Sequence, residues 1–216
     1  MRYKAVVFDL DGTLLDTLDD LSDAVNFALA KFALPLRTKE EVRGFVGNGI
    51  KLLMERAVGF SHPQAEEILQ TFKTYYGAHC QDKTQPYAGV LEVLALLKAR
   101  GVKTAVVSNK ADFAVKALAK AYFPALLEEA VGENESAGIR KKPAPDSLLT
   151  VMEKLGVTAE ETAYVGDSEV DIQTAGNAGV ACISVSWGFK TREFLLANGG
   201  KTVLDSAEEL LALFEG

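Results

Sequence analysis

The sequence has only two cysteines, Cys80 and Cys182, among its 216 residues. Two cysteines so far apart give neither a disulfide framework nor the paired spacing of a zinc site. We expect both to be reduced, as is usual in the cytosol, and we predict a cytoplasmic protein. The sequence also lacks an apolar run of about 18 residues, which a membrane-spanning helix needs. Its first residues become acidic too early for a signal peptide, so we expect no membrane partner.

Positive charge is scarce as well. The chain has 23 Lys and Arg against 30 Asp and Glu, a net charge of -7. This excess disfavours nucleic acid and anionic membranes as partners. An anionic substrate would need local lysines, a metal ion or aligned backbone amides. With 48% hydrophobic and 25% charged residues, the composition is that of a globular protein with a sizeable core.

What is present is an alternation of strand and helix patterns. Residues 3–8 form an apolar, β-branched run typical of a buried strand. Beyond Pro86, short apolar runs alternate with helical segments, and strands are predicted at 102–107, 130–131, 162–165, 180–185 and 202–204. This alternation predicts an α/β fold, in which a Rossmann-like parallel sheet is covered by helices on both faces.

The region between the first strand and Pro86 has a different pattern. Helical periodicity predicts helices at 18–32, 38–45, 50–57 and 63–76, the second opening with a capping box of Thr38 and Glu41. No strand is expected from residue 15 to residue 83. We therefore predict a discontinuous core of residues 1–14 and 84–216, with an inserted all-helical cap domain of residues 15–83.

Acidic residues follow two of the predicted strands. Asp9 and Asp11 come directly after the first strand, and Asp167 and Asp171 follow the strand at 162–165. Because the carboxyl ends of parallel strands meet at one edge of a sheet, we expect these residues to approach one another. Clustered carboxylates repel, and a hard divalent cation would relieve the conflict. The alternative is that they cap the helices that follow.

Anion-binding residue types follow the other strands. Ser108 and Asn109 end the strand at 102–107, where a hydroxyl and an amide at a helix start can bind an anion. Lys142 precedes a proline-rich turn and can act as a point charge against phosphate. Taken singly, these residues could be a helix cap and a solvated surface lysine. Together with the acids they predict a phosphoryl-transfer centre.

These motifs carry a family resemblance. The segments DLDGT (9–13), SN (108–109), KPAPD (142–146) and GDSEVD (166–171) resemble the haloacid dehalogenase-like hydrolases across essentially the whole chain. VGNGIKLLMERA (46–57), SNK (108–110) and SWGFKT (186–191) look most like phosphoglycolate phosphatases within that family. The resemblance implies a Rossmann-like core with a helical cap inserted after the first strand.

The resemblance also implies a reaction. Asp9 would be the nucleophile that attacks phosphorus, and Asp11 would protonate the leaving oxygen and then activate water. Ser108 and Lys142 would hold the transferring phosphoryl group, with supporting contacts from the two residues Thr13 and Asn109.

A magnesium ion is implied as the cofactor. The side chains of Asp9 and Asp167 and the backbone carbonyl of Asp11 would bind Mg²⁺, with Asp171 nearby. Because the dehalogenases of the family lack the second aspartate, Asp11 favours a phosphatase.

The implied substrate is a small phosphorylated metabolite, and 2-phosphoglycolate is our best expectation. Asn48 and Arg43 are candidate cap contacts to the leaving group, although an interhelical turn and a solvated charge explain them equally well. A phosphosugar mutase, a pyrophosphatase or another phosphatase of the same superfamily would share the core motifs. A phospho-receiver domain is an alternative of another class, disfavoured by the helical insertion and by Asp11. We expect a monomer or a homodimer.

Overall fold

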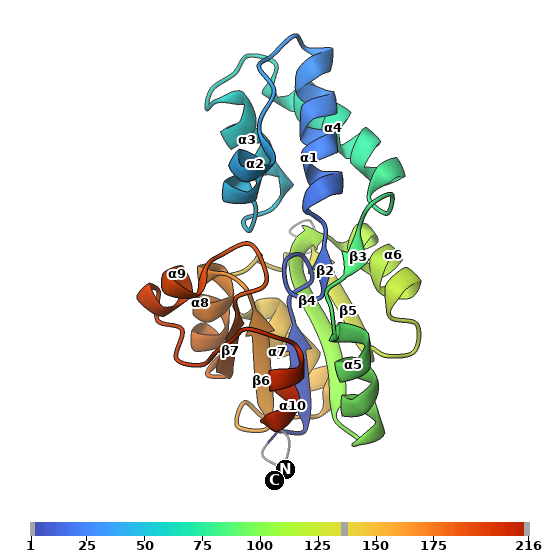
Figure 1. Ribbon diagram of the computed structural model, residues 1–216, viewed down its shortest axis with the longest axis vertical. Coiled ribbons are helices and arrows are strands. Elements are labelled where there is room, and N and C mark those ends of the chain that lie inside the picture. The colour runs from blue at the N-terminus through green and yellow to red at the C-terminus, as the bar shows by residue number, and fades with distance from the viewer. Residues whose placement is uncertain (1–2, 135–137, 214–216) are drawn as a thin grey trace. The chain divides into compact units, whose positions relative to one another are not determined.

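The computed structural model describes residues 3–134 and 138–213. It divides the chain into two compact units (Figure 1). The first, which we call the core unit, comprises Met1–Leu15 and Pro86–Gly216, and the second, the helical unit, comprises Asp16–Gln85. Within the described ranges, no helix combines the length and the apolar character needed to cross a membrane. Both cysteines lie within these ranges, and neither forms a disulfide.

A six-stranded parallel sheet forms the centre of the core unit, which confirms the predicted α/β fold. The strand order is β5-β4-β1-β6-β7-β8. The strands are β1 (Ala5–Phe8), β4 (Lys103–Ala111), β5 (Glu129–Glu133), β6 (Thr162–Gly166), β7 (Ala181–Val185) and β8 (Val203–Leu204).

Successive side chains of each strand point to opposite faces of this sheet, and helices bury both faces. In β1, Val6 and Phe8 join one apolar cluster and Ala5 and Val7 join another. The first cluster is covered by α5 (Val90–Ala99), α6 (Asp112–Tyr122) and α10 (Glu208–Ala212). The second is covered by α7 (Asp146–Leu155) and α8 (Glu169–Ala178), and α9 (Arg192–Ala197) connects β7 to β8.

The helical unit consists of the four helices that the periodicity predicts. They are α1 (Leu18–Lys31), α2 (Lys39–Phe45), α3 (Ile50–Val58) and α4 (Ala65–His79). The predicted capping box at the start of α2 is present, since Glu41 N donates to Thr38 Oγ1 at 3.2 Å and Thr38 N donates to Glu41 Oε2 at 2.7 Å. Phe72 and Ile68 of α4 and Val25 and Leu29 of α1 are fully buried in its core.

Two short strands join the units, and the first of them corrects the prediction that residues 15–83 contain no strand. β2 (Leu15–Asp16) pairs with β3 (Gln85–Pro86) in a separate two-stranded sheet. Two residues are too few to show the alternation by which a strand is recognised in a sequence. The chain therefore leaves the core and returns to it through two paired segments.

Candidate active site

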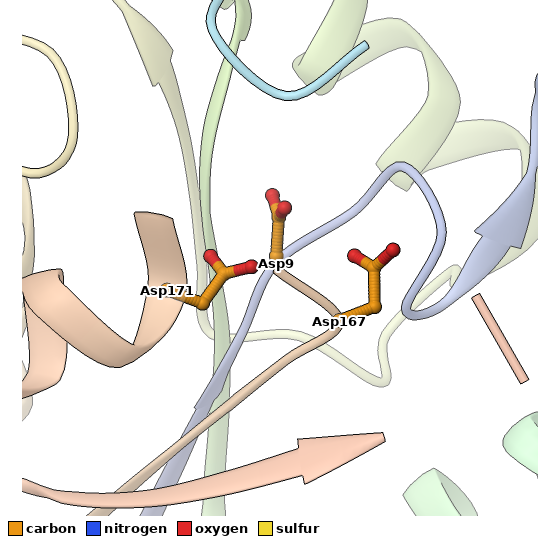
Figure 2. A group of neighbouring side chains, drawn as sticks. All are labelled: Asp9, Asp167 and Asp171. Atoms are coloured by element: carbon orange, nitrogen blue, oxygen red, sulfur yellow. The ribbon is translucent and has the colours of Figure 1, made fainter. Parts of the chain in front are cut away.

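Three carboxylates gather at the carboxyl edge of the sheet. Asp9 follows β1, Asp167 follows β6 and Asp171 lies in the first turn of α8. Phe8 pairs with Val165 in the sheet, and Asp9 N donates to the Val165 oxygen at 2.8 Å. This register brings the two strand ends together. One oxygen from each of the three carboxylates lies within 4.8 Å of the others, and Figure 2 shows their convergence.

The surroundings make this cluster electrostatically unfavourable on its own. Burial, reinforced by the charges of Asp171 and Asp11, raises the pKa of Asp9 to about 6, although Lys142 acts in the opposite direction. Burial together with the charges of Asp171 and Asp9 raises the pKa of Asp167 well above its usual range. A hard cation prefers carboxylate oxygens and would offset both effects, so the donor set fits Mg²⁺.

Asp171 is the most constrained of the three. Its side chain is completely buried, and Oδ1 accepts from Lys142 Nζ at 2.8 Å. Its Oδ2 accepts from Ser168 N at 3.1 Å and from Ser168 Oγ at 2.6 Å, which forms a capping box at the start of α8. The capping that the sequence offered as an alternative is thus real, but Asp171 also faces the cluster. Because Lys142 and Ser168 already occupy both of its oxygens, Asp171 suits a supporting role beside Asp9 and Asp167 in a cation site.

Asp167 is held by two loops of the core unit. Thr13 Oγ1 donates to Asp167 Oδ1 at 3.2 Å, and the backbone N–H of Phe189 donates to Oδ2 at 2.7 Å. Two glycines allow this close approach. A Cβ on Gly188 would lie 2.1 Å from the Gly12 oxygen, and a Cβ on Gly12 would lie 2.4 Å from Asp167 Oδ2. The hydroxyl of Thr13 thus orients a carboxylate of the acidic cluster, and a contact of Thr13 with phosphate stays a prediction.

Lys142 is buried beside the cluster and is not a solvated surface lysine. Its side chain is 3% exposed, and Nζ lies 3.0 Å from Asp9 Oδ1, 2.8 Å from Asp171 Oδ1 and 3.0 Å from the Tyr164 hydroxyl. Burial alone would lower the pKa of Lys142, but Asp171 and Asp9 outweigh it and hold that pKa well above its usual range. A permanent positive charge therefore lies against one oxygen of Asp9.

Asn109 places this lysine. Its Nδ2 donates to the Lys142 oxygen at 3.0 Å, and its Oδ1 accepts from Lys142 N at 2.8 Å. These bonds tie the end of β4 to the loop before α7. The expectation that Ser108 and Asn109 open a helix is wrong, because β4 continues to Ala111 and α6 begins at Asp112. Ser108 is buried at this strand end, 6% exposed.

Two further residues reach the site without having been singled out in the sequence. Lys110 Nζ lies 2.9 and 3.1 Å from the two carboxylate oxygens of Asp11. Tyr164 lies within β6, and its hydroxyl contacts Lys142. Lys110 follows Ser108 and Asn109 directly and belongs to the SNK segment that carries part of the family resemblance, but the sequence alone predicted no role for it. Tyr164 has no polar neighbour in sequence that distinguishes it from a core residue.

The two candidate substrate contacts lie in the helical unit. Arg43 lies on α2, where its Nε is 3.6 Å from Glu40 Oε2. Asn48 is half-buried in the turn between α2 and α3. Contacts of these two side chains with a leaving group stay a prediction.

A protein-family comparison adds to this geometry. The family model described as haloacid dehalogenase-like hydrolase matches residues 6–185, most of the chain. The chain belongs to this family. Residues 6–185 include all four acids and both buried lysines of the site, whereas the loop of Gly188 and Phe189 lies just beyond the matched region.

Similar proteins carry related names. A phosphoglycolate phosphatase from Pseudomonas savastanoi pv. phaseolicola is 35% identical to the hydrolase over 216 residues, covering 96% of this chain and 78% of that protein. Another from Haemophilus influenzae is 32% identical and covers 98% of both. These similarities confirm the predicted family and its phosphoglycolate phosphatase-like group.

Solved structures share the fold. A Lactobacillus delbrueckii subsp. bulgaricus protein, provisionally described as a phosphoglycolate phosphatase, is 38% identical with a TM-score of 0.93, and the match covers both chains completely. CbbY from Rhodobacter sphaeroides, solved in complex with phosphate, is 26% identical with a TM-score of 0.79, and the match covers 97% of this chain and 96% of that one.

Proposed function

We propose that this hydrolase is a phosphatase that cleaves a small phosphorylated metabolite, with 2-phosphoglycolate as its preferred substrate, through a phospho-aspartate at Asp9. The position of Asp9 carries the proposal. Its carboxylate lies at the sheet edge, next to a buried ammonium and within 4.8 Å of the ligand atoms of Asp167 and Asp171. The names of the relatives support the substrate.

In the first step, a carboxylate oxygen of Asp9 forms a bond to phosphorus as the bond from phosphorus to the leaving oxygen breaks. The carboxyl of Asp11 gives its proton to that leaving oxygen, so the product leaves as an alcohol. Lys142, whose Nζ is 3.0 Å from Asp9 Oδ1, places positive charge beside the transferring group. Ser108 offers a hydroxyl to the phosphoryl oxygens.

In the second step, water attacks phosphorus and the bond from Asp9 to phosphorus breaks. Asp11 accepts a proton from that water, which restores the starting state and yields inorganic phosphate. This two-step use of one carboxyl is why a second aspartate two positions after the nucleophile is needed.

Mg²⁺ would be held by the side chains of Asp9 and Asp167, by the backbone carbonyl of Asp11 and by support from Asp171. When bound, it would neutralise negative charge on the phosphate and on the cluster. Thr13 and Phe189 keep Asp167 oriented for this contact. Asn109 keeps Lys142 in place, so we assign it a positioning role in phosphate binding.

The helical unit would act as a cap that selects the leaving group, with Asn48 and Arg43 as candidate contacts. We place the enzyme in the cytoplasm as a monomer or homodimer without a nucleic-acid or membrane partner. A phosphosugar mutase would use the same core residues and differ by needing a bisphosphate activator. A receiver domain would not use Asp11 to remove its phosphate.

The test is a panel of phosphorylated metabolites assayed with Mg²⁺ and with EDTA, in the presence and absence of a sugar bisphosphate. We expect 2-phosphoglycolate to rank among the best substrates, EDTA to abolish turnover and the bisphosphate to have no effect. Asp9→Asn should lower kcat by at least about 10⁴-fold. Asp205→Asn, at a half-exposed surface carboxylate, is the control. Full activity in Asp9→Asn would reject the mechanism, and a sugar-biased profile would reject the substrate alone.

A further inference from the structure

Lys110 is a buried lysine that the mechanism above does not use. Its side chain is 3% exposed, and Nζ contacts both oxygens of Asp11 at 2.9 and 3.1 Å. The Asp11 side chain is 15% exposed. Burying an ammonium group is unfavourable, and an ion pair often fails to compensate for the lost hydration. A pair of this kind at a reaction centre therefore calls for an explanation beyond stability.

An irregularity in β4 delivers Lys110 to the site. The pairing of β4 with β5 shifts register between Val107 and Ala111, and Lys110 lies within this segment. Such irregularities re-aim side chains beside active sites. Asn109 reaches the Lys142 backbone, and the next residue reaches Asp11. The end of β4 thus supplies two neighbouring side chains to the site, one that contacts Lys142 and one that contacts Asp11.

Hydrogen bonds within the loop that follows β1 fix the backbone around Asp11 without any contribution from Lys110. Gly12 N donates to the Leu15 oxygen at 2.9 Å, Leu14 N donates to the Leu10 oxygen at 3.0 Å, and Asp11 itself bridges to Leu15. The freedom left to Asp11 is therefore rotation of its side chain. Contacts to both oxygens restrict that rotation.

We propose that Lys110 is a positioning residue that aims the Asp11 carboxyl at the leaving oxygen of the substrate. The inference rests on the proposed function, in which Asp11 transfers a proton to that oxygen. General acids act only within hydrogen-bond reach, and a displacement of about 1 Å can lower a rate by about 100-fold. Because Nζ contacts both oxygens, Lys110 fixes the orientation of the whole carboxyl group rather than that of one oxygen.

The test compares two leaving groups. An alkoxide such as that of 2-phosphoglycolate needs a proton as it departs, whereas the p-nitrophenolate of p-nitrophenyl phosphate does not. The value of kcat/KM reports the steps up to release of the first product, so it isolates this difference. We expect Lys110→Met to lower kcat/KM for 2-phosphoglycolate by about 10- to 100-fold and that for p-nitrophenyl phosphate by less than about threefold. Lys110→Arg, which keeps a charge and donors, should recover part of the loss.

A double-mutant cycle separates action through Asp11 from direct contact with the substrate. In an Asp11→Asn background, Lys110→Met should cause less than about a twofold further loss with 2-phosphoglycolate. Lys103→Met, at the other end of β4, is the control and should match the wild type. The thermal midpoint of each variant confirms that it is folded.

Each alternative outcome has a distinct meaning. Equal losses with both leaving groups, or a full further loss in the Asp11→Asn background, would overturn the positioning role while leaving the phosphatase assignment intact. If the wild type hydrolyses neither substrate, the proposed function itself fails. A loss confined to 2-phosphoglycolate and absent from the Asp11→Asn background supports the inference.

Discussion

The hydroxyl of Tyr164 lies 3.0 Å from Nζ of Lys142 and 3.0 Å from the backbone oxygen of Val107. The hydroxyl has two acceptors within reach, the Val107 oxygen at 3.0 Å and Asp171 Oδ1 at 3.3 Å, and with either of them a lone pair faces the ammonium group. A lysine ammonium has three N–H donors. Tyr164, Asp9 and Asp171 supply three acceptors, and these fix the direction of every N–H bond of Lys142.

Removal of this hydroxyl gives a first prediction. Tyr164→Phe keeps the ring and deletes the acceptor, which leaves one donor of Lys142 unsatisfied in a buried site. We expect kcat to fall by about 10-fold with a smaller change in KM, and the free energy of unfolding to fall by about 1–3 kcal/mol. Steady-state kinetics and urea unfolding measure the two effects. Tyr75→Phe in α4 serves as the control. An unchanged kcat in Tyr164→Phe would show that the contact does not orient the lysine.

A second prediction concerns the loop after β7. Gly188→Ala would place a methyl group against the Gly12 oxygen and Asp167, so the loop must move and the Phe189 N–H must leave Asp167. Loss of such an outer contact typically weakens metal binding by about 10- to 100-fold. We expect the Mg²⁺ concentration for half-maximal activity to rise by that factor.

The matched variant for this test is Gly176→Ala. Gly176 lies within α8, and nothing lies within 4 Å of the position that its Cβ would take. It should leave the Mg²⁺ dependence unchanged. If both variants show the same Mg²⁺ titration, the loop does not support the cation site.

The helical unit provides a third prediction. Asp20 on α1 is 2% exposed and accepts hydrogen bonds from the backbone N–H groups of Lys83 and Thr84 and from the Thr84 hydroxyl. Asp20→Ala would leave two backbone donors without this acceptor. We expect the free energy of unfolding to fall by about 2–4 kcal/mol, measured by urea titration.

Asp23 offers a control on the same helix. Its carboxylate pairs with Lys83 Nζ at 2.6 Å, but both side chains are about half exposed. Exposed ion pairs contribute little to stability. Asp23→Ala should therefore shift the urea midpoint far less than Asp20→Ala. Equal shifts would mean that the buried carboxylate does not hold the end of the insertion.

The sequence predicted those parts of the protein that depend on local patterns. The β1 run is apolar on both faces, as the centre of a parallel sheet requires, and the acids follow it and β6 directly. Parallel topology then brings Asp9 and Asp167 to one edge, a consequence of strand direction alone. The helices of the insertion followed from their periodicity and from the capping box at Thr38.

Other features depend on tertiary contacts that no local pattern encodes. The polar end of β4 reads as the start of a helix, yet pairing with β5 keeps it extended to Ala111. Lys110 and Tyr164 were missed because their roles come from neighbours 99 and 22 residues away in the sequence. The contact of Thr13 with Asp167 was not predicted either, because these residues are 154 positions apart in the sequence.

The pairing of β2 with β3 has a consequence for how such a protein can change. The insertion begins in β2 and ends in β3, and these two strands are hydrogen-bonded to each other. The two points at which it joins the core therefore stay close together whatever the length of the insertion. Loop closure depends only weakly on the number of residues enclosed. An insertion of another length or sequence can therefore replace the helical segment between residues 15 and 86 without moving the residues of the core site.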